Sequence, residues 1–192
     1  GTLRLQDLLH SLLLIRIIAG ELKKDQGDLF FEDRRFENLT QAWLGGDHYK
    51  WRLMRAGGVP EELVTGNGGD WEKFQKWAGV LELAAGSPLY HWSHLELRRY
   101  FGYGGVLNER TAEEVWALTR EKLKEPSMGA RGLIRQSGVK VLCTTDDPAD
   151  PLEWHRRLAE DPGFPVQVLP AWRPDRAMSL ERTDYPAYLE RL

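Results

Sequence analysis

Cysteine and long apolar stretches are both scarce in this sequence. The single cysteine, Cys143, excludes an intramolecular disulfide and fits a reducing compartment, so we expect a cytoplasmic protein. The longest apolar stretch, LLHSLLLIRIIAG over residues 8–20, is too short to span a bilayer and contains His10 and Arg16. It resembles the apolar part of a signal peptide only weakly, and a buried helix or strand is the favoured interpretation. We therefore expect no membrane partner.

Runs of one charge sign are absent from the sequence as well. The chain has 26 basic and 29 acidic residues, a formal net charge of −3, and no Lys/Arg run on one predicted face. The electrostatic footprint of a nucleic-acid-binding protein is therefore missing, and we expect no nucleic-acid partner. With 192 residues, of which 42% are hydrophobic, the chain can bury a core of its own.

Residues 36–126 are predicted to form a helical subdomain, after a less regular N-terminal segment over residues 1–35. Apolar residues recur at helical spacing, and turns containing Gly, Asn and Pro separate the repeats. The predicted helical segments are ENLTQAWL, HYKWRLMRAG, PEELV, DWEKFQKWAGVLELAA, PLYHWSHLELRRYFG and TAEEVWALTREKL. Thr111 and Glu114 are spaced as a capping box at the start of the last helix.

Residues 127–192 change to a pattern that predicts β/α units. VKVLCTTDDP is typical of a short strand, and DPLEWHRRLAED is typical of a helix with Asp150 as N-cap, Pro151 at the first helical position and Glu153 at the third. FPVQVLPAWRPD then predicts a second strand followed by a helix. A strand–helix–strand succession favours a parallel sheet, whose polar strand ends commonly carry the functional site.

The polar residues that follow the two predicted strands are expected to share one rim of that sheet. They are Thr144, Thr145, Asp146, Asp147, Trp172 and Arg173. Arg173 could grip a carboxylate through two parallel hydrogen bonds, or could simply cap a strand end. Asp146 and Asp147 could act as paired acid and base groups, although a turn or helix-entry role is at least as reasonable.

The segment GGDHYKWRLMR, residues 45–55, predicts a helix start with exposed chemistry. Asp47 can cap the helix, which places His48 and Tyr49 in the exposed first turn. An imidazole and a phenol there can exchange protons with a ligand. The competing interpretation is a solvated helix start with Tyr49 packed on Trp51 or Trp77.

The other histidines favour structural roles. His91 and His94 lie at i, i+3 on one helical face, which would suit a metal, but no third ligand is nearby and polar packing is favoured. His155 is expected on the surface.

Four segments resemble the uronate isomerases of the amidohydrolase superfamily. They are RFENLTQAWLGGDHYKWRLMRAGGV, PLYHWSHLELRRYFG, ARGLIRQSGVKVLCTTDDPADPLEWH and VLPAWRPDRAM, and the likeness runs from about Phe36 to the C-terminus. That family interconverts glucuronate with fructuronate and galacturonate with tagaturonate. The resemblance implies an α/β fold, a partial (β/α)₈ (TIM-type) barrel of the amidohydrolase kind with a helical insertion subdomain.

The resemblance also implies a set of site residues. His48 and Tyr49 stand where the family places catalytic residues, and Arg173 stands where it places the arginine that holds the substrate carboxylate. We predict Asp146 as a second substrate-binding residue, on the same rim. With a hexuronate bound, His48 and Tyr49 would polarise the carbonyl or assist proton movement between C1 and C2 through an enediol.

The sequence departs from the family where the metal should bind. The family's Asp-x-His-x-His segment on the first barrel strand is missing, so we predict no metal site and no cofactor in this chain, although zinc or another divalent metal belongs to the full-length family. A complete barrel needs about 250 residues. The chain thus resembles an N-terminal fragment or a shortened homologue, expected to be inactive alone and to associate as a homo-oligomer or with missing barrel segments. A non-catalytic sugar-acid-binding or structural remnant is the alternative.

Overall fold

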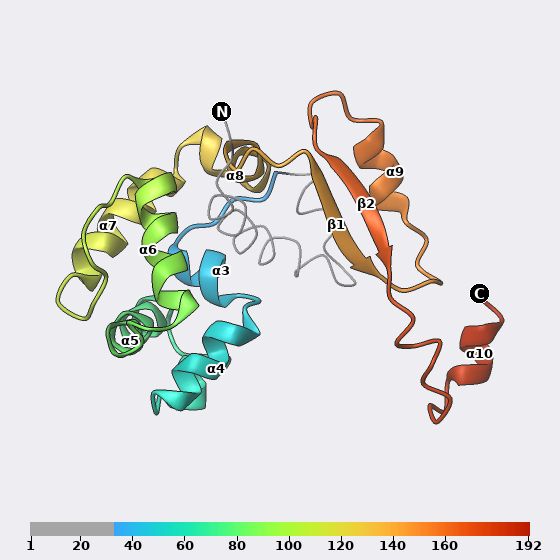
Figure 1. Cartoon of the computed structure of the whole chain (residues 1–192), viewed down its shortest axis with the longest axis horizontal. Helices are drawn as coiled ribbons and strands as arrows, with labels where there is room; N and C mark the ends of the chain where they lie inside the picture. Colours follow the sequence, from blue (N-terminus) through green and yellow to red (C-terminus); the bar gives the residue numbers. More distant parts are fainter. Residues whose placement is uncertain (1–32) are drawn as a thin grey trace.

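The computed structural model describes residues 33–192, and the predictions for residues 1–32, including the apolar stretch and His10, lie outside them. Figure 1 shows helices α3 to α7 gathered on one side and strands β1 and β2 with helix α9 on the other, with α8 between the two groups. The helices of the first group are α3 (Leu39–Leu44), α4 (His48–Ala56), α5 (Asp70–Leu83), α6 (Pro88–Phe101) and α7 (Ala112–Leu123). No helix within residues 33–192 is long and apolar enough to cross a membrane.

The helices of this first group confirm the helical segments that the spacing of apolar residues predicts, with two local differences. The PEELV segment forms only a short 3₁₀ turn, η1 (Glu61–Leu63). The prediction of a capping box at the start of α7 is wrong. Thr111 occupies the N-cap position, but its backbone is αR rather than extended, and its side chain accepts no hydrogen bond from the first turn of the helix. The Thr111 hydroxyl instead donates to the carbonyl of Val106 at 2.7 Å, which ties down the preceding loop.

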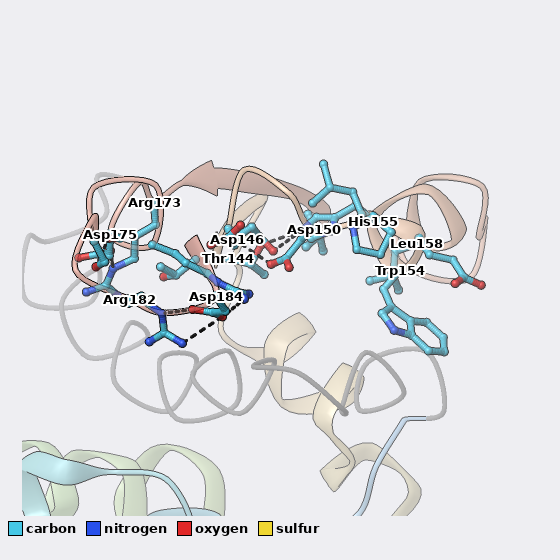
Figure 2. A pocket seen from close by; sticks show the side chains of 18 residues that line it. Thr144, Asp146, Asp150, Trp154, His155, Leu158, Arg173, Asp175, Arg182 and Asp184 are labelled. Atoms are coloured by element: carbon cyan, nitrogen blue, oxygen red, sulfur yellow. Dashed lines mark hydrogen bonds and ion pairs between the residues drawn. The ribbon is translucent and has the colours of Figure 1, made fainter. Parts of the chain in front are cut away.

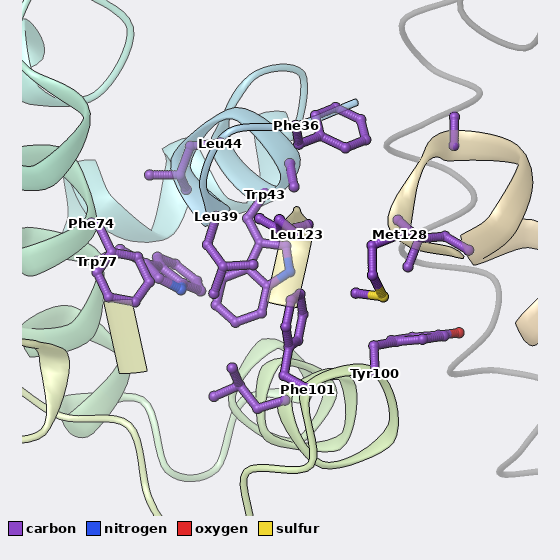
Figure 3. Packing of buried hydrophobic residues seen from close by; sticks show 14 of the residues in the cluster. Phe36, Leu39, Trp43, Leu44, Phe74, Trp77, Tyr100, Phe101, Leu123 and Met128 are labelled. Carbon is purple, nitrogen blue, oxygen red and sulfur yellow. The ribbon is translucent and has the colours of Figure 1, made fainter. Parts of the chain in front are cut away.

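Aromatic side chains form the centre of the helical group (Figure 3). Trp43 from α3 and Phe74 and Trp77 from α5 are almost completely buried. Their rings lie close to one another, with 6.5 Å between the centroids of Trp43 and Phe74. Removal of one such ring typically costs about 3–5 kcal/mol, so these residues anchor the helical part of the fold.

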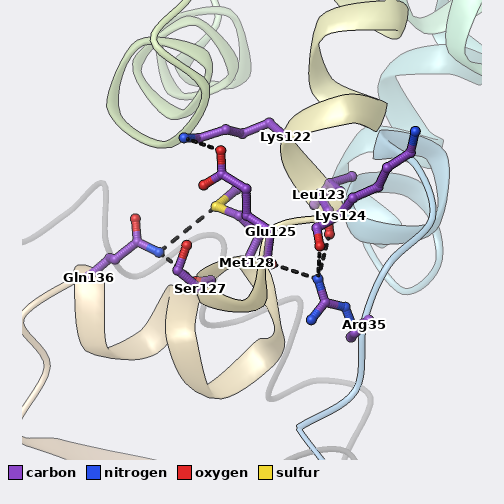
Figure 4. A network of polar contacts seen from close by, with 8 residues as sticks. All are labelled: Arg35, Lys122, Leu123, Lys124, Glu125, Ser127, Met128 and Gln136. Atoms are coloured by element: carbon purple, nitrogen blue, oxygen red, sulfur yellow. Dashed lines mark hydrogen bonds and ion pairs between the residues drawn. The ribbon is translucent and has the colours of Figure 1, made fainter.

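Polar contacts join the helical group to the segment that leads into the sheet (Figure 4). The Arg35 guanidinium donates to the carbonyls of Leu123, Lys124 and Glu125 at the end of α7, where a cation also suits the negative end of the helix. Gln136 on α8 donates to the carbonyl of Ser127 at 2.7 Å. Helix α8 (Ala130–Gln136) thereby packs on the 3₁₀ turn η2 (Pro126–Met128).

The sheet consists of two parallel strands, β1 (Val141–Asp146) and β2 (Gln167–Trp172). Helix α9 (Glu153–Ala159) connects them and packs on β2, and the short helix α10 (Tyr185–Leu189) follows. The α/β prediction is therefore confirmed at this coarse level. The described residues contain eight α-helices and this two-stranded sheet, and they do not form a barrel.

The start of α9 differs from the prediction that Asp150 caps it. The Asp150 carboxylate accepts the backbone N–H of Asp147 at 2.9 Å, while its own N–H donates to the carbonyl of Asp147 at 2.9 Å. A local turn therefore uses the carboxylate that was expected to cap the helix. The helix begins later, at Glu153, behind Leu152 in the left-handed conformation (φ 51°).

Candidate functional site

A cavity of about 730 Å³ lies at the carboxyl ends of β1 and β2. The loop after β1, the first turn of α9 and the segment over residues 173–184 complete its wall. Figure 2 shows Arg173, Asp175, Arg182 and Asp184 on one side of it, His155 and Trp154 on the other, and Asp146 between them.

The strand register places the two predicted substrate-binding residues together. Asp146 is opposite Trp172 in the parallel ladder, and the backbone N–H of Arg173 donates to the carbonyl of Asp146 at 2.9 Å. Both residues line the cavity. The predicted shared rim is confirmed, because parallel strands end at the same edge of a sheet.

A chain of hydrogen bonds runs through the buried hydroxyl of Thr144. Its Oγ1 donates to Asp146 Oδ2 at 2.5 Å and lies 2.6 Å from His155 Nε2. A hydroxyl has one proton, so with that proton given to the carboxylate, the imidazole must donate through Nε2–H. His155 Nδ1 is buried and has no hydrogen-bond partner among residues 33–192. The tautomer and orientation of His155 are therefore set by Thr144.

His155 was expected on the surface, and that prediction is wrong. Because α9 begins only at Glu153, His155 lies in its first turn and reaches back over the end of β1 to Thr144. The signal in the sequence was a short strand-to-helix connection that carries a histidine in the first helical turn, behind a Thr-x-Asp strand end.

Asp147 has a structural role in the loop after β1. Its carboxylate accepts the N–H of Ala149 at 2.9 Å and the phenol O–H of Tyr188 at 3.0 Å. Tyr188 is buried, and its burial and the neighbouring Asp147 carboxylate both raise the pKa of the phenol. The turn interpretation therefore fits Asp147, whereas Asp146 faces the Thr144 hydroxyl.

Three arginines line the far side of the cavity, and they differ in how they are paired. Arg176 and Arg182 both donate to Asp184, at 2.8 and 2.9 Å, and they lower the pKa of that carboxyl to about 2. Arg173 uses Nε for Asp175 at 2.5 Å, and its side chain is 53% exposed. Its two Nη atoms have no partner among the described residues, so the end of the Arg173 fork is available to an anion.

His48 and Tyr49 lie elsewhere, in the first turn of α4, and neither lines this cavity. Asp47 caps the helix as predicted, and both side chains are exposed, with 4.3 Å between their ring centroids. The structure therefore brings Asp146 and Arg173 together but leaves His48 and Tyr49 on a separate element. Their catalytic assignment stays a prediction.

The prediction that the histidines of α6 serve polar packing rather than metal binding is confirmed for His94. Its Nε2 accepts the N–H of Leu107 at 2.8 Å, which leaves Nδ1–H to donate to the carbonyl of Tyr90 at 2.7 Å. Burial lowers the pKa of His94 and favours this neutral form. Within residues 33–192 no group of three or more His, Cys, Asp or Glu side chains is arranged to hold a metal ion.

Comparison with known proteins gives a consistent result. The family model described as glucuronate isomerase matches residues 24–192. The uronate isomerase of Lachnospira eligens is 65% identical over 161 residues, which are 84% of this chain and 34% of that protein. The uronate isomerase of Bacillus subtilis is 50% identical over 162 residues, again 84% of this chain and 34% of that protein. The chain thus spans about a third of the length of the curated relatives it matches.

Two solved structures share the fold. The crystal structure of uronate isomerase from Thermotoga maritima superposes with a TM-score of 0.80 at 35% identity, over 100% of this chain and 44% of that chain. The crystal structure of glucuronate isomerase from Caulobacter crescentus gives a TM-score of 0.77 at 21% identity, over 96% and 41%. At that lower identity the second likeness concerns the fold alone.

Proposed function

The chain belongs to the glucuronate isomerase family, and we propose that it provides the uronate-binding part of an aldose–ketose isomerase. The proposed substrates are D-glucuronate with D-fructuronate and D-galacturonate with D-tagaturonate. The observation that carries the proposal is the position of Arg173, whose unpaired Nη atoms line the same cavity as the Thr144–Asp146 hydrogen bond.

A hexuronate suits this cavity in size and chemistry. Small-molecule sites commonly have volumes of about 300–1,000 Å³, and the cavity falls in that range at about 730 Å³. A guanidinium binds a carboxylate through two parallel N–H···O bonds, so Arg173 would hold the acid end of the sugar. Asp146 would accept hydrogen bonds from sugar hydroxyls, because an ionised carboxylate has only acceptors.

Isomerisation requires a proton to move between adjacent carbons while the charge of the enediolate is stabilised. We propose His48 and Tyr49 as the groups that polarise the carbonyl and carry the proton, on the strength of the family resemblance alone. Because neither residue lines the cavity, carboxylate binding and proton transfer are separable in this chain. That separation favours, as a second candidate, a chain that binds uronate without turning it over.

The divalent metal implied by the family does not fit the described part of the chain. The side chains over residues 33–192 offer no group of three ligands, whereas catalytic zinc usually has three protein ligands. We therefore assign no step of the proposed chemistry to a metal.

We further propose that β1, α9 and β2 are neighbouring units of a (β/α)₈ barrel into which α3 to α7 are inserted. Their parallel pairing and helical crossover support this arrangement. Val141 and Leu169 expose apolar surface on the sheet, and Trp172 at its end is 72% exposed. Such a surface favours association with further barrel segments or with a second copy. A stable monomer at micromolar concentration in sedimentation experiments would count against association.

Binding and turnover distinguish the two candidate functions. We expect calorimetry to detect saturable binding of D-glucuronate to the chain and none of D-glucose, which lacks the carboxylate. A coupled assay that detects the ketose product should show no turnover at an enzymatic rate by the chain alone. Equal binding of both sugars would remove the basis of the proposal, and rapid turnover would exclude the binding-only candidate.

A further inference from the structure

A cluster of charged side chains is buried beneath the turn that carries His48 and Tyr49. We call Asp47, Lys50 and Glu96 the buried charge cluster. Lys50 is 0% exposed, Glu96 is 2% exposed and Asp47 is 5% exposed. Lysine and glutamate are almost never fully buried unless they are paired, and an apolar replacement of such a cluster is often neutral or stabilising. Its presence at this position therefore calls for a role other than stability.

One carboxylate connects the buried ammonium to the helix start. Asp47 Oδ1 accepts the backbone N–H of Tyr49 at 2.9 Å and that of Lys50 at 3.3 Å. Asp47 Oδ2 accepts from Lys50 Nζ at 2.8 Å. The ammonium thus holds the same carboxylate that satisfies the N–H groups of the first turn. The conformation of the His48–Tyr49 turn depends on Lys50 through Asp47.

Glu96, on helix α6, is buried near enough to this pair for the charges of Lys50 and Asp47 to influence its pKa. Neither of its carboxylate oxygens has a hydrogen-bond partner among the described residues. Burial is the largest influence and raises the pKa of Glu96 to about 7, against the opposing attraction of Lys50. The neighbouring Asp47 carboxylate adds to the effect of burial by disfavouring the ionised form. Tyr100, one turn further along α6, has its pKa raised mainly by its own burial and in smaller part by Glu96.

The carboxylates of Asp47 and Glu96 both attract the ammonium of Lys50. With Glu96 protonated, Lys50 and Asp47 form a neutral pair. With Glu96 ionised, the cluster carries a net negative charge in a medium of low dielectric constant, and Lys50 is attracted to both carboxylates. An ionised Glu96 therefore competes electrostatically with Asp47 for the Lys50 ammonium.

We propose that Lys50 is a positioning residue for the His48–Tyr49 turn, and that Glu96 on α6 controls how firmly Lys50 holds Asp47 against that turn. The structural part of this inference stands by itself. Its relevance to the isomerase rests on the proposed function, because it assumes that His48 and Tyr49 act on the substrate.

The test uses the whole chain and the amide hydrogen exchange of individual residues, measured by NMR. Lys50→Met removes the ammonium and keeps most of the side-chain length, and Lys76→Met on the exposed face of α5 is the matched control. We expect at least a tenfold loss of amide protection at positions 49 and 50 in Lys50→Met, with α5 amides unchanged. Unchanged protection at positions 49 and 50 in a folded Lys50→Met protein would overturn the inference.

Glu96→Gln provides the second arm and does not require Lys50→Met to fold. The amide resonance of Tyr49 should shift with pH in the wild-type chain in step with the protonation of Glu96. That pH-dependent shift should disappear in Glu96→Gln. Identical titrations in the two proteins would overturn the role of Glu96.

A third measurement separates this inference from the proposed function. D-glucuronate is titrated into wild-type and Lys50→Met chains while the His48 imidazole resonance is followed. In Lys50→Met, a loss of amide protection together with a weaker response of His48 to the sugar supports both the positioning role of Lys50 and the proposed function. If protection is lost in Lys50→Met but His48 does not respond to the sugar even in the wild type, the positioning role of Lys50 stands and the proposed catalytic role of the turn fails.

Discussion

The backbone N–H of Arg173 donates to the backbone carbonyl of Asp146 across the ends of two parallel strands, at 2.9 Å. This bond fixes the spacing of the two residues proposed to contact the substrate, because both side chains start from a paired ladder rather than from separate loops. The sheet itself therefore sets the relative positions of Asp146 and Arg173.

Replacement of Arg173 should weaken uronate binding. Loss of a bidentate charged contact commonly costs about 2–5 kcal/mol, so Arg173→Met is expected to raise the Kd for D-glucuronate roughly thirtyfold or more, as measured by calorimetry. Arg110→Met, at an exposed loop position, should leave the Kd unchanged. Asp175→Asn should act in the opposite direction and tighten binding, because it releases Arg173 Nε. Normal affinity in Arg173→Met would show that the carboxylate binds elsewhere.

Thr144→Val should destabilise the chain and release the His155 imidazole. Valine keeps the shape of threonine but leaves the Asp146 carboxylate and His155 Nε2 without their shared partner. An unsatisfied buried polar group costs about 1–3 kcal/mol, which denaturant unfolding can measure. Thr145→Val, on the exposed face of the same strand, is the control. ¹⁵N NMR of His155 should show the Nε2–H tautomer in the wild type and a mixture in Thr144→Val; an unaltered imidazole would refute the hydrogen-bond chain.

The pH dependence of stability should reveal Glu96. The pKa of Glu96 is raised to about 7 in the folded chain, from an ordinary value of 4.5. The folded state therefore binds this proton more tightly than the unfolded state, and the associated stability is complete below pH 4.5 and is lost as the pH rises to about 7. The loss is about 3 kcal/mol for a shift of this size.

Glu96→Gln should remove this slope, so its free energy of unfolding relative to the wild type should increase between pH 5 and pH 8. Glu82→Gln, at an exposed position on α5, should parallel the wild type throughout. A wild-type slope that persists in Glu96→Gln would assign the effect to another group.

Metal analysis after dialysis should find no stoichiometric zinc in the chain. The prediction follows from the missing His-x-His pattern and from the absence of a three-ligand group within residues 33–192. One tightly held zinc ion per chain would contradict it and would point to ligands outside the described residues.

Local signals predicted much of this fold. Helical periodicity located α5 and α6, and the Asp47 cap followed from one residue and its neighbours. The rim that holds Asp146 and Arg173 followed from a general property of parallel strands. Helix α8 was missed because it is seven residues long and its N-cap residue, Gly129, has no side chain that could cap it.

Long-range pairings could not be predicted in the same way. The contact of His155 with Thr144 depends on where α9 begins, and the turn between Asp147 and Asp150 delays that start. Lys50 in a polar helix start is typical of an exposed residue, and only the packing of α4 against α3 and α5 shows that it is buried. Burial of a charge depends on elements far apart in the chain, which a pattern of neighbouring residues does not record.

Chemical-shift mapping of the Arg173 guanidinium tests the central claim most directly. The ¹⁵N-labelled chain is titrated with D-glucuronate and, in parallel, with D-glucose. We predict saturable shifts of the Arg173 side-chain resonances and of the amides of residues 144–147 with glucuronate only, all lost in Arg173→Met. Shifts that are equal for the two sugars, or that persist in Arg173→Met, would contradict the assignment of this cavity as the uronate site.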